Sequence, residues 1–152
     1  MQNSLISIMG PTGIGKTDLA FELYDSANVE IISVDSVQVY KHLNIGSGKP
    51  DKKVLTKYPH KLIDVIDPDE NYSTAKFQKG CLKEIKKAHS SKKIPLLVGG
   101  TMLYFKNLFH GLSELPESSE EIRKEVELEC NQKGLEVIYG HLKQIDPLSA
   151  KN

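Results

Sequence analysis

The chain has 152 residues, with 20 basic and 20 acidic side chains and a formal net charge of zero. This is the length of one domain that can bury a core, and the balanced charge excludes a global field that attracts nucleic acid or membrane. Any contact with a nucleic acid must therefore come from a local patch. The two cysteines lack metal-site spacing and predict reduced thiols. No signal peptide or bilayer-length apolar stretch is present, so we expect a cytoplasmic protein with no membrane contact.

The first predicted elements surround a phosphate-binding loop. An apolar run at 5–9 predicts a buried strand, and 17–24 predicts a helix. Between them the sequence has the pattern Gly-x-x-x-x-Gly-Lys-Thr, whose backbone N–H groups converge on phosphate oxygens at a helix N-terminus. Lys16 adds a positive charge, and the Thr17 hydroxyl is suited to hold Mg²⁺. The loop consists of Gly10, Pro11, Thr12, Gly13, Ile14, Gly15, Lys16 and Thr17.

Strands and helices alternate along the next hundred residues. Strands are expected at 30–34, 61–66 and 94–98, and helices at 73–90, with Ser73 as its cap, and at 101–109. This order predicts an α/β protein of the P-loop type, with a parallel sheet flanked by helices.

The pattern changes after Pro116. A capping box from Ser118 to Glu121 predicts the start of a charged helix that ends near Gly134, and an amphipathic helix follows as far as Ile145. We therefore expect an α/β body over 1–116 and the beginning of a helical insert over 117–152.

Several polar residues follow the predicted strands. Ligands of open α/β sheets bind beyond the carboxyl ends of the strands, which places Asp35 toward the phosphate ligand. Its carboxylate can bind Mg²⁺, accept a proton or only close a turn. Gln38 can hydrogen-bond an adenine edge. Lys49 either reaches a phosphate or is solvated, His60 is expected to pack rather than catalyse, and Thr101 is expected to cap a helix.

Together these stretches resemble the tRNA dimethylallyltransferase family, also called tRNA isopentenyltransferases. The resemblance covers nearly the whole chain. Its motifs are 10–17, 35–40 with Gly46 and Lys49-Pro50, 59–64, 72–77, 95–104, 111–116 and 146–150.

The resemblance implies transfer of a dimethylallyl group from dimethylallyl diphosphate to the exocyclic amine of the adenine beside the anticodon in tRNA. The phosphate loop would hold the diphosphate with Mg²⁺, and Asp35 matches the general base of the family. The positions that match tRNA contacts are Asp35, Ser36, Val37, Gln38, Thr101 and Arg123. Family members are about twice as long, so we expect the chain to be the N-terminal part of a longer enzyme. We also expect this enzyme to be a monomer.

Two other functions fit the phosphate loop. A P-loop small-molecule kinase shares the loop and the parallel sheet, but kinases of this kind clamp the transferred phosphoryl group with arginines. Arg123 is the only arginine of the chain, which disfavours this alternative. The other alternative is a binding module without catalysis, which the Asp35 carboxylate beside a complete phosphate loop disfavours.

Overall fold

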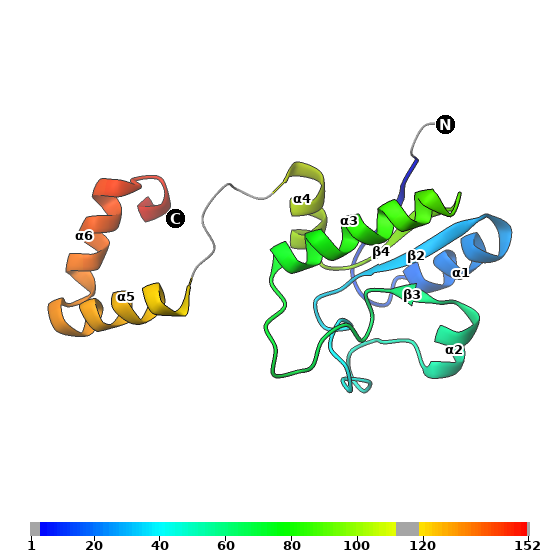
Figure 1. Ribbon diagram of the computed structural model, residues 1–152, viewed down its shortest axis with the longest axis horizontal. Helices are drawn as coiled ribbons and strands as arrows, with labels where there is room; N and C mark the ends of the chain where they lie inside the picture. Colours follow the sequence, from blue (N-terminus) through cyan, green and yellow to red (C-terminus); the bar gives the residue numbers. More distant parts are fainter. Residues whose placement is uncertain (1–3, 112–118, 152) are drawn as a thin grey trace. The chain divides into compact units, whose positions relative to one another are not determined.

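A computed structural model of the chain describes residues 4–111 and 119–151. It divides into two compact units, Met1–Leu112 and Ser113–Asn152. The first contains a four-stranded parallel sheet in the order β1-β4-β2-β3 (Figure 1). The strands are β1 (Ile6–Met9), β2 (Val29–Val34), β3 (His60–Lys61) and β4 (Ile94–Gly99).

Helices cover both faces of this sheet. The side chains of β2 alternate between the two faces, so that Ile31 and Ile32 belong to different apolar clusters. Ile31 packs with residues of α1 and with Tyr58, whereas Ile32 packs with residues of α3 and α4. The predicted P-loop α/β fold is confirmed. Its helices are α1 (Lys16–Ser26), α2 (Lys52–Lys57), α3 (Thr74–Ser90) and α4 (Met102–His110).

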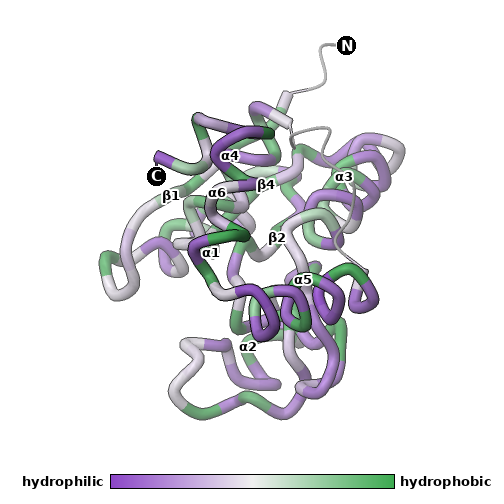
Figure 2. Tube along the Cα trace, turned by 90° about the vertical axis from the view of Figure 1, so that its left-hand side faces the viewer, coloured by the Kyte–Doolittle hydropathy of each residue, from purple (hydrophilic) through white to green (hydrophobic). Residues whose placement is uncertain are grey.

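Helix α3 begins and ends where its sequence predicts. The Ser73 hydroxyl accepts a hydrogen bond from the Lys76 backbone N–H, which satisfies one donor of the first turn. Phe77, Cys81 and Ala88, on the inner side of the helix, are buried. Figure 2 shows hydrophilic and hydrophobic residues alternating around its turns, as expected of a helix with one face on a core.

The third strand is much shorter than the predicted 61–66. The backbone leaves the extended conformation because Leu62 and Asp64 have φ of 64° and 54°. The chain then runs beside the segment after β2, where the Val65 N–H donates to the Val39 carbonyl over 2.7 Å and Ile66 pairs with Tyr40. The prediction of a strand over 61–66 is therefore wrong beyond Lys61.

The described part of the second unit, residues 119–151, contains two α-helices and a short 3₁₀ turn. They are α5 (Glu120–Lys133), α6 (Leu135–Ile145) and Ser149–Lys151. Ser119, not Ser118, caps α5, by accepting a hydrogen bond from the Ile122 N–H. The third helical position is then Ile122 rather than a glutamate, so the predicted capping box is wrong. Ser118 itself and the expected boundary at 116 lie outside the described residues.

Within residues 4–111 and 119–151, every helix is too short or too polar to cross a lipid bilayer.

Candidate functional site

The phosphate loop connects β1 directly to α1. Gly13 and Gly15 have φ of 87° and 85°, a region that side chains with a Cβ disfavour. Gly15 occupies the cap position of α1 and has no side chain to satisfy the N–H groups of the first turn. These N–H groups and the positive end of the helix dipole together favour an anion at this end of α1.

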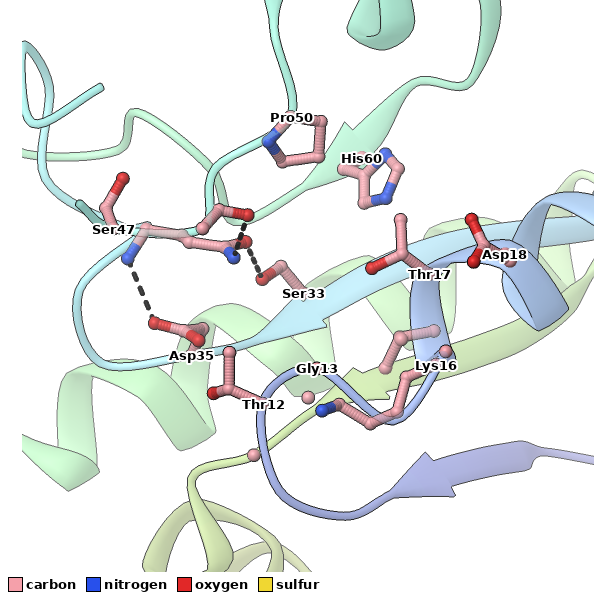
Figure 3. A pocket seen from close by; sticks show the side chains of 16 residues that line it. Thr12, Gly13, Lys16, Thr17, Asp18, Ser33, Asp35, Ser47, Pro50 and His60 are labelled. Carbon is pink, nitrogen blue, oxygen red and sulfur yellow. Dashed lines mark hydrogen bonds between the residues drawn. The ribbon is translucent and has the colours of Figure 1, made fainter. Parts of the chain in front are cut away.

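A cavity of about 270 Å³ opens beside this loop (Figure 3). Its walls come from the loop and α1, from the carboxyl ends of β2 and β4, and from the loop that precedes α2. It therefore lies at the edge of the sheet where ligands of parallel α/β proteins bind. The lining residues are Thr12, Gly13, Gly15, Lys16, Thr17, Asp18, Ser33, Asp35, Gln38, Ser47, Gly48, Pro50, His60, Val98, Gly99 and Gly100.

The donors around the cavity suit phosphate and a hard cation. The Lys16 Nζ donates to the Pro11 carbonyl over 2.6 Å and so holds its charge at the loop. The Thr17 hydroxyl and the Asp18 and Asp35 carboxylates supply oxygen atoms only. Among the described residues no group of three or more His, Cys, Asp and Glu side chains can hold a metal ion. The oxygen atoms of Thr17, Asp18 and Asp35 are of the kind that hold a magnesium ion.

Asp35 closes a turn and lines the cavity at the same time. Its Oδ1 accepts hydrogen bonds from the backbone N–H groups of Val37 (2.8 Å) and Gln38 (3.1 Å). This geometry agrees with the turn interpretation of the sequence. Oδ1 accepts both hydrogen bonds, so the other carboxylate oxygen, Oδ2, is not needed for the turn. A structural and a chemical role are therefore compatible in this one side chain.

The Gln38 amide ties the end of β2 to the loop that precedes α2. Its Oε1 accepts from the buried Ser33 hydroxyl over 3.1 Å, and its Nε2 donates to the Gly48 carbonyl over 3.1 Å. The oxygen and the nitrogen of the amide thus each make a hydrogen bond within the protein. The sequence predicted a contact with a base but neither of these two hydrogen bonds. Each end keeps one further hydrogen-bonding position, because an amide has two N–H donors and two acceptor lone pairs.

Thr101 does not cap α4 with its side chain. It occupies the cap position, but its hydroxyl makes no capping hydrogen bond. The Oγ1 instead accepts from the Ser36 backbone N–H over 3.1 Å and lies 3.4 Å from the Ser36 hydroxyl. The capping interpretation is wrong, and the threonine instead holds the loop that carries Asp35.

Lys49 is neither a phosphate ligand nor a solvated side chain. Only 2% of its side chain is exposed, and its Nζ donates to the Asp64 carboxylate and the Tyr40 carbonyl, both over 2.7 Å. This buried cation stabilises the loop between β2 and α2. The sequence did not predict this role, because a lysine in a glycine-rich stretch carries no signal of burial.

His60 packs as the sequence predicts. Its Nδ1 lies 2.6 Å from the Tyr58 carbonyl, and its ring meets the edge of the Phe21 ring. Burial lowers the pKa of His60 below its ordinary value of 6.5, although the hydrogen bond to Tyr58 opposes this shift. The folded protein therefore favours the neutral imidazole.

This burial predicts a pH dependence of stability. As the pH falls through about 6.5, the unfolded chain binds a proton that the folded chain does not, and the free energy of unfolding decreases until the pH reaches the folded pKa. His60→Gln is expected to flatten this slope in thermal melts of the full-length protein from about pH 8 to about pH 5. The control is His110→Gln at an exposed position, which leaves the burial of His60 untouched. Parallel slopes for the His60 variant and the unmodified protein would contradict the prediction.

Comparison with known proteins identifies the family. The family model described as IPP transferase matches residues 38–152. The chain belongs to the IPP transferase family. The resemblance that its motifs predict is thereby confirmed.

Solved structures of similar proteins cover nearly all of this chain. The full-length tRNA isopentenylpyrophosphate transferase of Bacillus halodurans is 36% identical with a TM-score of 0.71, over 99% of this chain and 50% of its own. The Staphylococcus epidermidis tRNA Δ(2)-isopentenylpyrophosphate transferase is 37% identical with a TM-score of 0.66, over 97% and 48%. A eukaryotic dimethylallyltransferase acting on tRNA is 31% identical with a TM-score of 0.79, over 97% and 37%. The chain thus spans half or less of the length of these relatives.

In this IPP transferase chain the predicted site residues fall into two groups. Five residues of the phosphate loop line one cavity together with Asp35 and Gln38, namely Thr12, Gly13, Gly15, Lys16 and Thr17, whereas Gly10, Pro11 and Ile14 are not among its lining residues. Ser36 and Thr101 are hydrogen-bonded to each other and follow the lining residues Asp35 and Gly100 in the chain. Val37, in the same loop, is 43% exposed. Arg123 belongs to α5 in the second unit.

Proposed function

We propose that the full-length protein transfers a dimethylallyl group from dimethylallyl diphosphate to the exocyclic amine of the adenine beside the anticodon in tRNA. The observation that carries this proposal is the shared cavity of the phosphate loop and the Asp35 carboxylate. A phosphate site and a proton acceptor in one cavity suit a reaction that releases diphosphate and deprotonates an amine. Membership of the IPP transferase family supports the same reaction.

The phosphate loop receives the diphosphate in this proposal. The N–H groups of the loop and of the first turn of α1 donate to phosphate oxygens, and Lys16 exchanges the Pro11 carbonyl for one of them. Thr17 would hold Mg²⁺ through its hydroxyl, and the ion would supply positive charge that stabilises the leaving group.

Asp35 accepts the proton that the amine loses. The adenine nitrogen forms a bond to C1 of the dimethylallyl group, the bond between C1 and the diphosphate oxygen breaks, and the electron pair leaves with the diphosphate. One proton of the amine passes to the Asp35 carboxylate. The turn made by Oδ1 keeps this carboxylate directed at the cavity without a change of its backbone.

The loop 35–38 and Thr101 are proposed to meet the target adenine. Thr101 holds Ser36 in place, and the exposed Val37 offers an apolar contact for the base. The Gln38 amide offers its remaining N–H and lone pair to the adenine edge, as glutamine does in adenine recognition.

The decisive assay uses the full-length protein with unmodified tRNA and radiolabelled dimethylallyl diphosphate. We expect label in an adenosine of the tRNA after digestion to nucleosides, and we expect pyrophosphate to compete with dimethylallyl diphosphate in the absence of tRNA. Parallel reactions contain labelled ATP and a panel of small hydroxyl acceptors. Phosphoryl transfer from ATP without prenyl transfer would reject the proposal in favour of the kinase.

Arg123 is proposed to contact tRNA. It lies in the first turns of α5, and a guanidinium forks onto an RNA phosphate or stacks on an unpaired base. Arg123→Ala is expected to raise the KM for tRNA while leaving the affinity for dimethylallyl diphosphate and the Tm unchanged. Lys124→Ala, at the neighbouring exposed position, is the matched control. A lower Tm with unchanged tRNA kinetics would instead assign Arg123 to a stabilising contact on the helix surface.

A further inference from the structure

Five lysines cover the outer side of α3. Lys76, Lys79, Lys83, Lys86 and Lys87 are all exposed, and at 3.6 residues per turn they occupy an arc of about 100° around the helix. We call this surface the lysine face of α3. It extends about 16 Å along the helix axis, at 1.5 Å per residue. Several of these lysines, with Leu82 and two serines, line a shallow depression at the surface.

Most of this positive charge is not neutralised by neighbouring carboxylates. Glu84 is the only acidic residue in α3, and it pairs with Lys87 over 2.6 Å. Lys76 donates to the Asn71 carbonyl. Lys79, Lys83 and Lys86 make no ion pair with any described residue. Three adjacent ammonium groups therefore face solvent side by side.

The neutral charge of the whole chain conceals this local excess. Residues 1–112 contain 15 lysines and 11 acidic residues, whereas residues 113–152 contain 5 basic and 9 acidic residues. Helix α3 alone has five lysines and one glutamate, so its net charge equals the excess of the entire 1–112 segment. A helix with this concentration of charge creates a local field that attracts a polyanion.

We propose that the lysine face of α3 binds the phosphate backbone of the RNA substrate, outside the cavity that holds the diphosphate. This inference rests on the proposed function, because it assigns a second contact to the same tRNA. Lysines act on phosphates as point charges and read no base, so the contact adds affinity without sequence preference.

The surroundings of the helix favour RNA over an anionic membrane. A helix that lies on a bilayer needs an exposed apolar face that enters the acyl region. The apolar side of α3 is already used inside the protein, where Phe77, Cys81 and Ala88 are buried. On the exposed side Leu82 is the one large apolar residue among those described. A positively charged surface that has no exposed apolar face fits a polyanion in water, such as RNA, better than a lipid bilayer.

The test removes three charges in the full-length protein with Lys79→Gln, Lys83→Gln and Lys86→Gln together. Glutamine preserves helix propensity, so the fold is expected to remain. The matched control removes three exposed lysines of α2 with Lys52→Gln, Lys53→Gln and Lys57→Gln. The dissociation constant for unmodified tRNA is measured against salt concentration, and the KM for dimethylallyl diphosphate is measured in parallel.

Each phosphate contact adds about 0.7 to 0.9 to the slope of log K against log salt, so the α3 variant is expected to lose about 2 to 3 from this slope. Its dissociation constant for tRNA rises about tenfold or more near 0.1 M salt. The KM for dimethylallyl diphosphate stays unchanged, and the α2 control retains the unmodified slope.

Other results would overturn the inference and can be distinguished from a failure of the proposed function. An unchanged slope in the α3 variant, with normal tRNA binding by the unmodified protein, rejects the RNA contact alone. Equal losses in both triple variants show a nonspecific charge effect and also reject it. Loss of adsorption to phosphatidylglycerol vesicles with unchanged tRNA binding assigns the face to a membrane instead. No tRNA binding or prenyl transfer by the unmodified protein rejects the proposed function itself.

Discussion

Replacement of Asp35 by asparagine in the full-length protein is expected to lower kcat for prenyl transfer by about a hundred- to ten-thousand-fold, the usual cost of losing a general base. An amide has nearly the shape of the carboxylate but does not accept a proton at neutral pH. The affinity for dimethylallyl diphosphate should not change, because the phosphate loop and Lys16 are untouched.

Asparagine is the informative substitution because Asp35 also has a structural role. Its Oδ1 accepts the N–H groups of Val37 and Gln38, and an asparagine Oδ1 can accept the same two hydrogen bonds. Asp35→Ala removes the turn and the base together, and is expected to lower the Tm as well. Comparison of the two variants therefore separates the shape of the loop from the chemistry of the carboxylate.

Single-turnover kinetics with saturating dimethylallyl diphosphate measure the chemical step directly. If Asp35→Asn turns over at a near-normal rate while Asp35→Ala is impaired, Asp35 is a turn residue and another group accepts the proton. If both variants transfer the prenyl group slowly and only Asp35→Ala has a lower Tm, Asp35 acts both as the turn residue and as the general base.

The phosphate loop and the main elements around it could be predicted because their signals are local. A glycine pattern between an apolar run and a helix, a serine at the cap of α3 and two glycines where β4 ends each act within a few residues. The cavity at the carboxyl ends of the strands also follows from the parallel order, since ligands of such sheets bind at that edge.

The contacts that fix the site could not be predicted because they join distant residues. The Thr101 hydroxyl accepts a hydrogen bond from the Ser36 N–H, 65 residues away in the sequence, and the Lys49 ammonium donates to the Asp64 carboxylate, 15 residues away. Each of these side chains also has an ordinary local explanation, as a cap or as a solvated lysine. Only the fold decides between the two, because burial and neighbours are tertiary properties.

The second unit shows the same limit. The spacing of Leu135, Ile138, Leu142 and Ile145 predicts a helix, and α6 has the expected bounds. Neither α5 nor α6 has a buried residue among those described, and Leu135 and Ile145 are 71% and 84% exposed. A periodic pattern predicts which face of a helix is apolar, but it does not identify what covers that face.

Gly99→Ala is expected to destabilise the protein by about 3 kcal/mol or more, at the upper end for overpacked positions. In the sheet, Gly99 stands between Met9 of β1 and Val34 of β2. A Cβ at Gly99 would lie 2.0 Å from the Val34 carbonyl oxygen and 2.5 Å from its carbonyl carbon. These are backbone atoms of a central strand, so relief requires β2 and β4 to separate where they line the cavity.

The measurement is the Tm of the full-length variant, which should fall by roughly 6 °C or more for a loss of this size. Gly80→Ala in α3 is the matched control. Its Cβ would meet only the ends of the Leu62 and Tyr72 side chains, at 3.3 and 3.4 Å, and alanine favours the helix.

Because Thr101 binds the Val34 carbonyl and the Ser36 N–H, separation of the strands also shifts the Asp35 loop. Prenyl transfer should therefore fall even below the melting temperature of the variant. A Gly99→Ala protein with an unchanged Tm and normal turnover would show that the ends of β2 and β4 are not closely packed, and that the Asp35 loop does not depend on them.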